Sequence, residues 1–181
     1  MYKLSLKHGI LGLLTYQPMT GYDVGKLFDR SLSFFWQCQT SQIYRELNTM
    51  ETLKWVSSNL EIQTPKPNKK IYTITNEGKE ELIRWVSEMN IASAMTVKSE
   101  FLMKLFFFAK IDKSLAINVL SAFASACEQA LAQMQSVNTQ ATNENEIMDA
   151  IFWEMTCDFG RTYYEACIDW ALRSIKVLTD C

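Results

Sequence analysis

Apolar residues recur with a helical period between Thr40 and Thr52. At about 100° per residue, Ile43, Leu47 and Met50 fall on one face of a helix. The opposite face is polar and carries Ser41, Gln42, Arg45, Asn48, Thr49 and Thr52. We therefore expect an amphipathic helix whose apolar stripe docks on a small core and whose polar face points outward.

After this helix the period changes to two. Val56, Leu60 and Ile62 alternate with polar residues, and Tyr72 and Ile74 do so further along, which is typical of half-buried strands. The segment between them carries three lysines, with no acid from residue 63 to residue 76. These lysines are Lys66, Lys69 and Lys70. A polar-faced helix followed by a hairpin with a basic tip predicts a winged helix-turn-helix domain.

The remainder of the first half supplies the other helices of such a domain. Residues 4–14 predict a first helix, and Gly21 opens a second that runs to Asp29. We expect Tyr22, Leu27 and Phe28 on this second helix to face the Thr40–Thr52 helix. Thr75 is a favourable N-cap for a fourth helix, which is expected to leave the domain and lead onward.

The second half predicts helices alone. Residues 99–110 are apolar on nearly all sides, so we expect them to be buried on several sides. Residues 146–178 predict a helix roughly 50 Å long. One apolar stripe precedes this helix and consists of Leu115, Val119, Ala122, Phe123, Ala126, Ala130 and Met134. A second lies on the helix itself and consists of Phe152, Met155, Phe159, Tyr163, Ala166 and Trp170. Such a long stripe favours a homodimer, and an intramolecular helical bundle is the alternative.

Composition restricts the class of protein further. The chain has 181 residues, 48% hydrophobic and 21% charged, with a net charge of -2. Residues 1–90 carry 11 Lys and Arg against 9 Asp and Glu, and the later residues 7 against 11. The apolar runs at residues 10–14 and 101–109 are too short for an export signal or a membrane span. We expect a cytoplasmic protein with no membrane partner.

Few residues of this chain suit catalysis or metal binding. The one histidine, His8, is expected at the surface or edge of the first helix, and a single histidine excludes a His-rich metal site and a zincin motif. The five cysteines are scattered without a C-x-x-C pair, so neither a disulfide framework nor a zinc site is indicated. No glycine-rich phosphate loop is present. We expect no enzyme, no cofactor and no metal site.

Roughly half of the chain resembles the PadR family of winged-helix transcriptional regulators, and more narrowly its branch of virulence-gene activators. The resemblance rests on Gly21-Tyr22-Asp23, Phe35-Trp36, Gln42-Ile43-Tyr44-Arg45-Glu46-Leu47, Met50, Pro67, Lys70-Ile71-Tyr72-Thr73-Ile74-Thr75, Gly78, Leu82 and Trp85. Two positions depart from the family pattern. Lys54 precedes Trp55 where the family usually has Gly, and Lys69 stands where it usually has Arg.

The residues and the resemblance together imply a mainly α protein with a small β-wing. Residues 1–92 are expected to form the DNA-binding domain, and residues 96–181 a helical dimerisation domain that also suits an effector. The expected function is sequence-specific binding of double-stranded DNA, as a homodimer on a pseudo-palindromic operator. The expected DNA-binding residues are Thr40, Ser41, Gln42, Tyr44, Arg45, Asn48, Thr49, Lys66, Lys69 and Lys70.

Two further interpretations remain open, one of an effector pocket and one of the function. By resemblance, some PadR-type proteins bind aromatic effectors between their domains, which makes Trp36, Trp85 and Phe101 candidates for the wall of an effector pocket. Core packing explains the same aromatic residues. The alternative function is a winged-helix module for protein interaction or ligand sensing that does not bind an operator.

Overall fold

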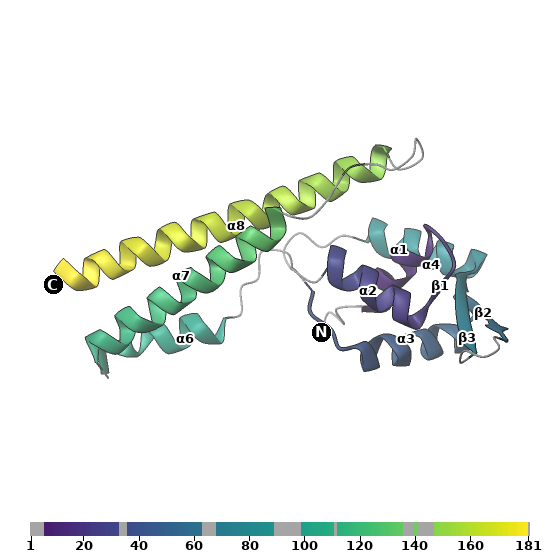
Figure 1. Cartoon of the computed structure of the whole chain (residues 1–181), viewed down its shortest axis with the longest axis horizontal. Coiled ribbons are helices and arrows are strands. Elements are labelled where there is room, and N and C mark those ends of the chain that lie inside the picture. Colours follow the sequence, from purple (N-terminus) through teal and green to yellow (C-terminus); the bar gives the residue numbers. More distant parts are fainter. Residues whose placement is uncertain are drawn as a thin grey trace. The chain divides into compact units, whose positions relative to one another are not determined.

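A computed structural model describes residues 6–32, 36–62, 68–88, 99–110, 112–135, 140 and 147–180. The chain forms two compact units, Met1–Met95 and Thr96–Cys181. The first unit contains all the described strands, and the second consists of helices (Figure 1).

The first unit is a winged helix. Its helices are α1 (Leu6–Leu14), α2 (Gly21–Ser31), α3 (Thr40–Thr52) and α4 (Asn76–Ser87), and its strands are β1 (Met19–Thr20), β2 (Val56–Glu61) and β3 (Lys69–Ile74). The sheet is antiparallel with the order β1-β3-β2. The predicted winged-helix architecture is therefore confirmed, and β1, which is too short for a periodicity argument, is the added element.

The core of this unit lies where α1, α2 and α3 meet. Ile10, Val24, Leu47 and Met50 are fully buried there, and Ile43 is buried beside them. The predicted inner stripe of α3 is thus confirmed. Burial of this stripe fixes the rotation of α3 about its own axis, so its polar residues are held on the outside.

Several predictions of inward-facing residues in this unit are wrong. Leu60 and Ile62 are 63% and 78% exposed, because the far end of the hairpin projects beyond the helices that cover Val56. Tyr22 is 57% exposed, while Phe28, six residues further along α2, is buried.

The junction between α3 and β2 holds the start of α4. Lys54 has φ 61, in the left-handed region, which turns the chain from the end of α3 into β2. The Thr75 hydroxyl donates to the Lys54 carbonyl at 2.6 Å and accepts from the Gly78 amide at 3.1 Å. Thr75 therefore caps α4 as predicted and also ties this helix to the turn before the wing.

His8 is buried, which corrects the expectation of a surface position. Its ring stacks on Trp85 with the centroids 4.8 Å apart, and its Nε2 lies 2.8 Å from Glu81 Oε1. The reason is that α4 packs against α1 and covers the side of α1 that carries His8. Burial lowers the pKa of His8 against the opposing effect of Glu81, so the ring is neutral at pH 7 and donates to the carboxylate.

The second unit contains α6 (Glu100–Phe106), a 3₁₀ turn η1 (Phe108–Lys110), α7 (Lys113–Gln135) and α8 (Ile147–Asp180). Helices α7 and α8 lie side by side (Figure 1) and pack against each other. The buried residues of these two helices are Ala116, Leu120, Ala124, Cys127, Met134, Cys157, Gly160 and Ala171. Phe101 stacks on Phe123 at 4.5 Å, and Trp170 meets Phe123 edge-on at 5.9 Å.

The expected burial pattern of the second unit differs from the observed one. None of the residues of α6 is buried, and Phe106 is 82% exposed. The expectation that residues 99–110 are buried on several sides is therefore wrong within a single chain. On α7 the buried line runs through Ala116 and Leu120, whereas Leu115 from the predicted stripe is exposed. The buried line of α7 mixes small side chains, such as Ala116 and Ala124, with the larger Leu120 and Met134.

Helix α7 is also long and apolar enough to cross a membrane, judged by length and composition only. Its most apolar 18 residues have a mean hydropathy of 1.3. In this fold α7 packs along α8, and a helix in a soluble helical bundle has the same kind of composition.

Candidate nucleic-acid interface

The outer face of α3 presents a continuous polar surface. Because Ile43, Leu47 and Met50 face the core, the opposite positions are directed to solvent. Exposed there are Thr40, Ser41, Tyr44, Arg45, Asn48 and Thr49. Hydroxyl, amide and guanidinium groups on one helix face suit phosphate oxygens and the base edges of a major groove.

Two polar side chains of α3, Gln42 and Thr49, already have partners in this helix or just before it. The Gln42 Oε1 accepts from the Gln39 backbone amide at 2.8 Å, which stabilises the start of the helix. The Gln42 amide nitrogen remains a donor, but a two-bond contact with adenine would require Oε1 to share or leave this bond. The Thr49 hydroxyl donates to the Arg45 carbonyl at 3.0 Å, so its oxygen is available as an acceptor.

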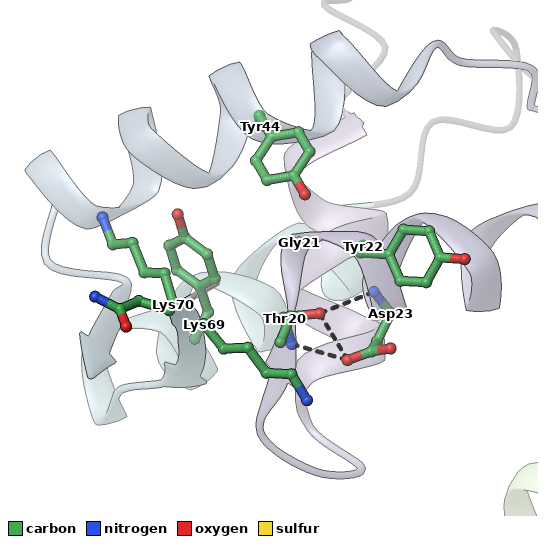
Figure 2. A pocket seen from close by; sticks show the side chains of 9 residues that line it. Thr20, Gly21, Tyr22, Asp23, Tyr44, Lys69 and Lys70 are labelled. Carbon is green, nitrogen blue, oxygen red and sulfur yellow. Dashed lines mark hydrogen bonds between the residues drawn. The ribbon is translucent and has the colours of Figure 1, made fainter. Parts of the chain in front are cut away.

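A hollow of about 510 Å³ lies between α2, α3 and β3. Figure 2 shows Tyr44 reaching from α3 over Gly21, with Tyr22 at the start of α2 and Lys69 and Lys70 on β3. The rest of its lining is Thr20, Asp23, Asn68 and Tyr72. The hollow therefore sits between the helix expected to read DNA and the wing strand expected to hold it.

Gly21 permits the close approach of Tyr44 to α2. A Cβ at position 21 would lie 2.5 Å from Tyr44 Cε1, well inside contact distance. The first turn of α2 is capped by the Thr20 side chain, which accepts from the Asp23 amide at 3.2 Å. The glycine is thus required by the packing of the tyrosine ring on the helix start.

The lysines of the wing differ in their surroundings. Lys70 Nζ lies 2.7 Å from Glu51 Oε2, so the expectation of a cluster without a nearby acid is wrong for Lys70. Lys69 is exposed and stands opposite Glu61 in the strand register. Lys66 lies outside the described residues. Contacts of all three with DNA stay predictions.

The three residues proposed for an effector pocket all have packing roles. Trp36 packs against the core of the first unit, and Trp85 stacks on His8. Phe101 belongs to the second unit, where it stacks on Phe123. The effector pocket itself stays a prediction.

Sequence reasoning missed two residues of this surface, Glu51 and Gly21. Glu51 occupies the last turn of α3 and reaches a lysine 19 positions further along the chain. The sequence predicts Gly21 as a helix start and as part of the Gly21-Tyr22-Asp23 motif, but it does not show the close contact of Gly21 with Tyr44. Among the described residues there is no group of three or more His, Cys, Asp or Glu that could hold a metal ion.

A three-helix core, a three-stranded sheet with a hairpin wing and an outward polar third helix define a winged helix-turn-helix protein. Two families match the chain in succession. Residues 10–84 match the transcriptional regulator PadR-like family, and residues 97–179 match the virulence activator alpha C-terminal domain. The chain is thus similar to the PadR-like family over residues 10–84 and to the C-terminal domain of virulence activators over residues 97–179.

Individual proteins show the same likeness. The negative transcriptional regulator PadR of Bacillus subtilis is 37% identical over 108 residues, which are 60% of this chain and 59% of the relative. A crystal structure of B. subtilis PadR with operator DNA is similar at 25% identity, with a TM-score of 0.78, over 96% of this chain and 98% of that one. The Vibrio cholerae virulence activator AphA gives 26% identity and a TM-score of 0.74 over 97% and 99%. The matched segment spans about half the length of the curated relatives.

Proposed function

We propose that this protein is a PadR-type transcriptional regulator that binds double-stranded DNA as a homodimer in the cytoplasm. The observation that carries the proposal is the polar outer face of α3 beside a hollow flanked by the wing lysine Lys69. The likeness to B. subtilis PadR, a protein solved with operator DNA, supports it.

In this proposal α3 enters the major groove. Arg45 and Asn48, exposed on its outer face, meet base edges, and Thr40 and Ser41 at its start meet phosphates. The backbone of one strand then passes over the hollow, within reach of the Tyr44 hydroxyl and the Lys69 ammonium group (Figure 2). The wing holds the adjacent phosphates.

The exposed apolar stripe of α8 supports the homodimer. Phe152, Met155 and Phe159 follow one another at helical spacing and are 59%, 61% and 73% exposed in one chain. An apolar stripe of this size on a helix is stable in water when it packs against a second copy. A two-fold dimer would place two α3 helices in successive major grooves, so the operator would be a pseudo-palindrome with half-sites one or two helical turns apart.

Binding to the DNA upstream of the protein's own gene tests the function. We expect a footprint with two-fold symmetry and an affinity that falls steeply with salt. Arg45→Ala should weaken binding to the footprinted site more than binding to a scrambled duplex, whereas Glu80→Gln on exposed α4 should change neither. A protein-interaction module would bind neither duplex, and that result would refute the proposal.

An aromatic effector is a further part of the proposal. Tryptophan fluorescence titrated with phenolic acids, with and without DNA, tests it, because Trp36 and Trp85 are the expected reporters in the first unit. We expect quenching together with a change in DNA affinity. If neither is observed with any phenolic acid, these residues serve packing alone.

A further inference from the structure

The carboxylate of Glu51 connects α3 to both long strands of the wing. Its Oε2 lies 2.7 Å from Lys70 Nζ on β3, and its Oε1 accepts a hydrogen bond from the Ser58 hydroxyl on β2. Ser58 and Lys70 sit on neighbouring strands, since Ser58 pairs with Tyr72 and Leu60 with Lys70. One side chain in the last turn of α3 thus holds the hairpin at two points.

Lys70 is held by its own domain on a second side as well. Its Nζ lies 5.1 Å from the centroid of the Tyr72 ring, and Tyr72 is buried. The hydrogen bonds from Lys70 and Ser58 lower the pKa of Glu51, and the bond to Glu51 raises the pKa of Lys70. Both groups are therefore ionised at neutral pH, and the Lys70 charge is already matched.

Moving Lys70 to a phosphate would leave the Glu51 carboxylate facing a polyanion without its counter-ion. The like charges would repel, and the hairpin would lose one of its two contacts with Glu51. Lys69, the adjacent residue on β3, points to the other face of the strand and is exposed. It has no ion pair among the described residues, so it reaches a phosphate without breaking one.

Building on the proposed DNA-binding function, we propose that Glu51 is a positioning residue that sets the wing against α3, with Lys70 as its counter-ion. Lys69, and not Lys70, is then the β3 cation that meets the DNA backbone. The angle between helix and wing is thereby fixed before DNA arrives, which lowers the entropic cost of binding.

The salt dependence of binding to a mixed-sequence duplex separates the two lysines. Each phosphate contact contributes about 0.9 to the slope of log affinity against log salt concentration. Lys69→Ala should therefore lower the slope by about one for each protomer bound. Lys70→Ala should leave the slope unchanged, as should Lys79→Ala, which removes an exposed lysine of α4. An equal loss of slope for Lys69→Ala and Lys70→Ala would overturn the assignment.

Amide hydrogen exchange of the free protein tests the positioning role without DNA. Glu51→Ala should speed exchange in β2 and β3 at least several-fold. Glu51→Gln keeps an acceptor for Ser58 and should have a smaller effect, while Glu80→Gln, which removes an exposed carboxylate of α4, should have none.

In Glu51→Gln, Lys70 no longer has its carboxylate partner and can meet a phosphate. The salt slope of DNA binding should therefore rise by about one per protomer. Unchanged strand exchange in Glu51→Ala would refute the positioning role. If that exchange speeds up but the wild-type protein shows no salt-dependent DNA binding, the proposed function fails while the positioning role of Glu51 stands.

Discussion

Lys54 occupies a backbone conformation that favours glycine, so Lys54→Gly should stabilise the first unit. Its φ of 61 places it in the left-handed region at the end of α3. That region costs an L-residue with a side chain roughly 1–2 kcal/mol relative to its preferred conformation. Replacing it with glycine increases the freedom of the unfolded chain, which offsets about 0.4–1 kcal/mol. A net gain of about 0.5–1 kcal/mol is expected.

The hydrogen bonds at this turn do not depend on the lysine side chain. The Lys54 amide donates to the Glu51 carbonyl at 3.1 Å, and the Lys54 carbonyl accepts from the Thr75 hydroxyl. Both groups belong to the backbone and are retained in the glycine variant. The predicted gain therefore isolates the conformational cost at position 54.

Calorimetry of the full chain measures this gain. For a domain of this size about 1 kcal/mol shifts Tm by roughly 4–8 °C, so the transition of the first unit should rise by about 2–8 °C. Lys54→Asn should give a smaller rise, because asparagine tolerates the left-handed region better than other residues with a side chain. Lys54→Ala is the matched control and should give no rise. A rise for alanine equal to that for glycine would refute the reasoning, since alanine keeps the unfavourable φ.

Three further predictions follow from the packing. Gly21→Ala should displace the Tyr44 ring, lower the Tm and weaken DNA binding about tenfold in a fluorescence anisotropy titration. Adding Tyr44→Ala to this variant should restore the Tm but not the affinity. Neutral, buried His8 contributes stability that is complete above pH 6.5 and is lost as pH falls below it, because its folded pKa is lowered. Urea unfolding of His8→Gln should therefore be flat between pH 7 and 5 where the wild type weakens. The Arg84 guanidinium holds the pKa of Glu81 at about 2, so both proteins should lose stability below about pH 4.5. Phe159→Ser should halve the mass measured by light scattering without loss of helical circular dichroism, and an unchanged mass would exclude Phe159 from the dimer contact.

The parts of the fold that followed from the sequence are those set by local periodicity. The spacing of Ile43, Leu47 and Met50 is sufficient to define α3, its buried side and hence its outer face. The N-cap at Thr75 likewise depends on a few adjacent residues. In both cases the interaction that decides the structure lies within one or two turns of the chain.

The misplaced residues are those whose burial depends on a distant element. His8 is buried because α4 returns to α1, a contact across 73 positions. Alternation predicts Leu60 as an inward strand residue, yet none of the described helices covers it, and it is 63% exposed. The sequence predicts Lys70 as a free cation, because its partner Glu51 lies on another element. Periodicity identifies the side of an element but not what covers that side.

The lengths of α7 and α8 show why the second unit leaves apolar residues exposed. Helix α8 has 34 residues and α7 has 23, which correspond to about 50 Å and about 35 Å. Helix α7 therefore cannot cover the full length of α8, and it covers one side only, through Cys157, Gly160 and Ala171. Phe152 and Phe159 lie on another side, where no described residue of the same chain buries them. A second copy supplies the missing cover, and the same contact would fix the distance between two α3 helices, so in this proposal the surface that forms the dimer also selects the spacing of the operator.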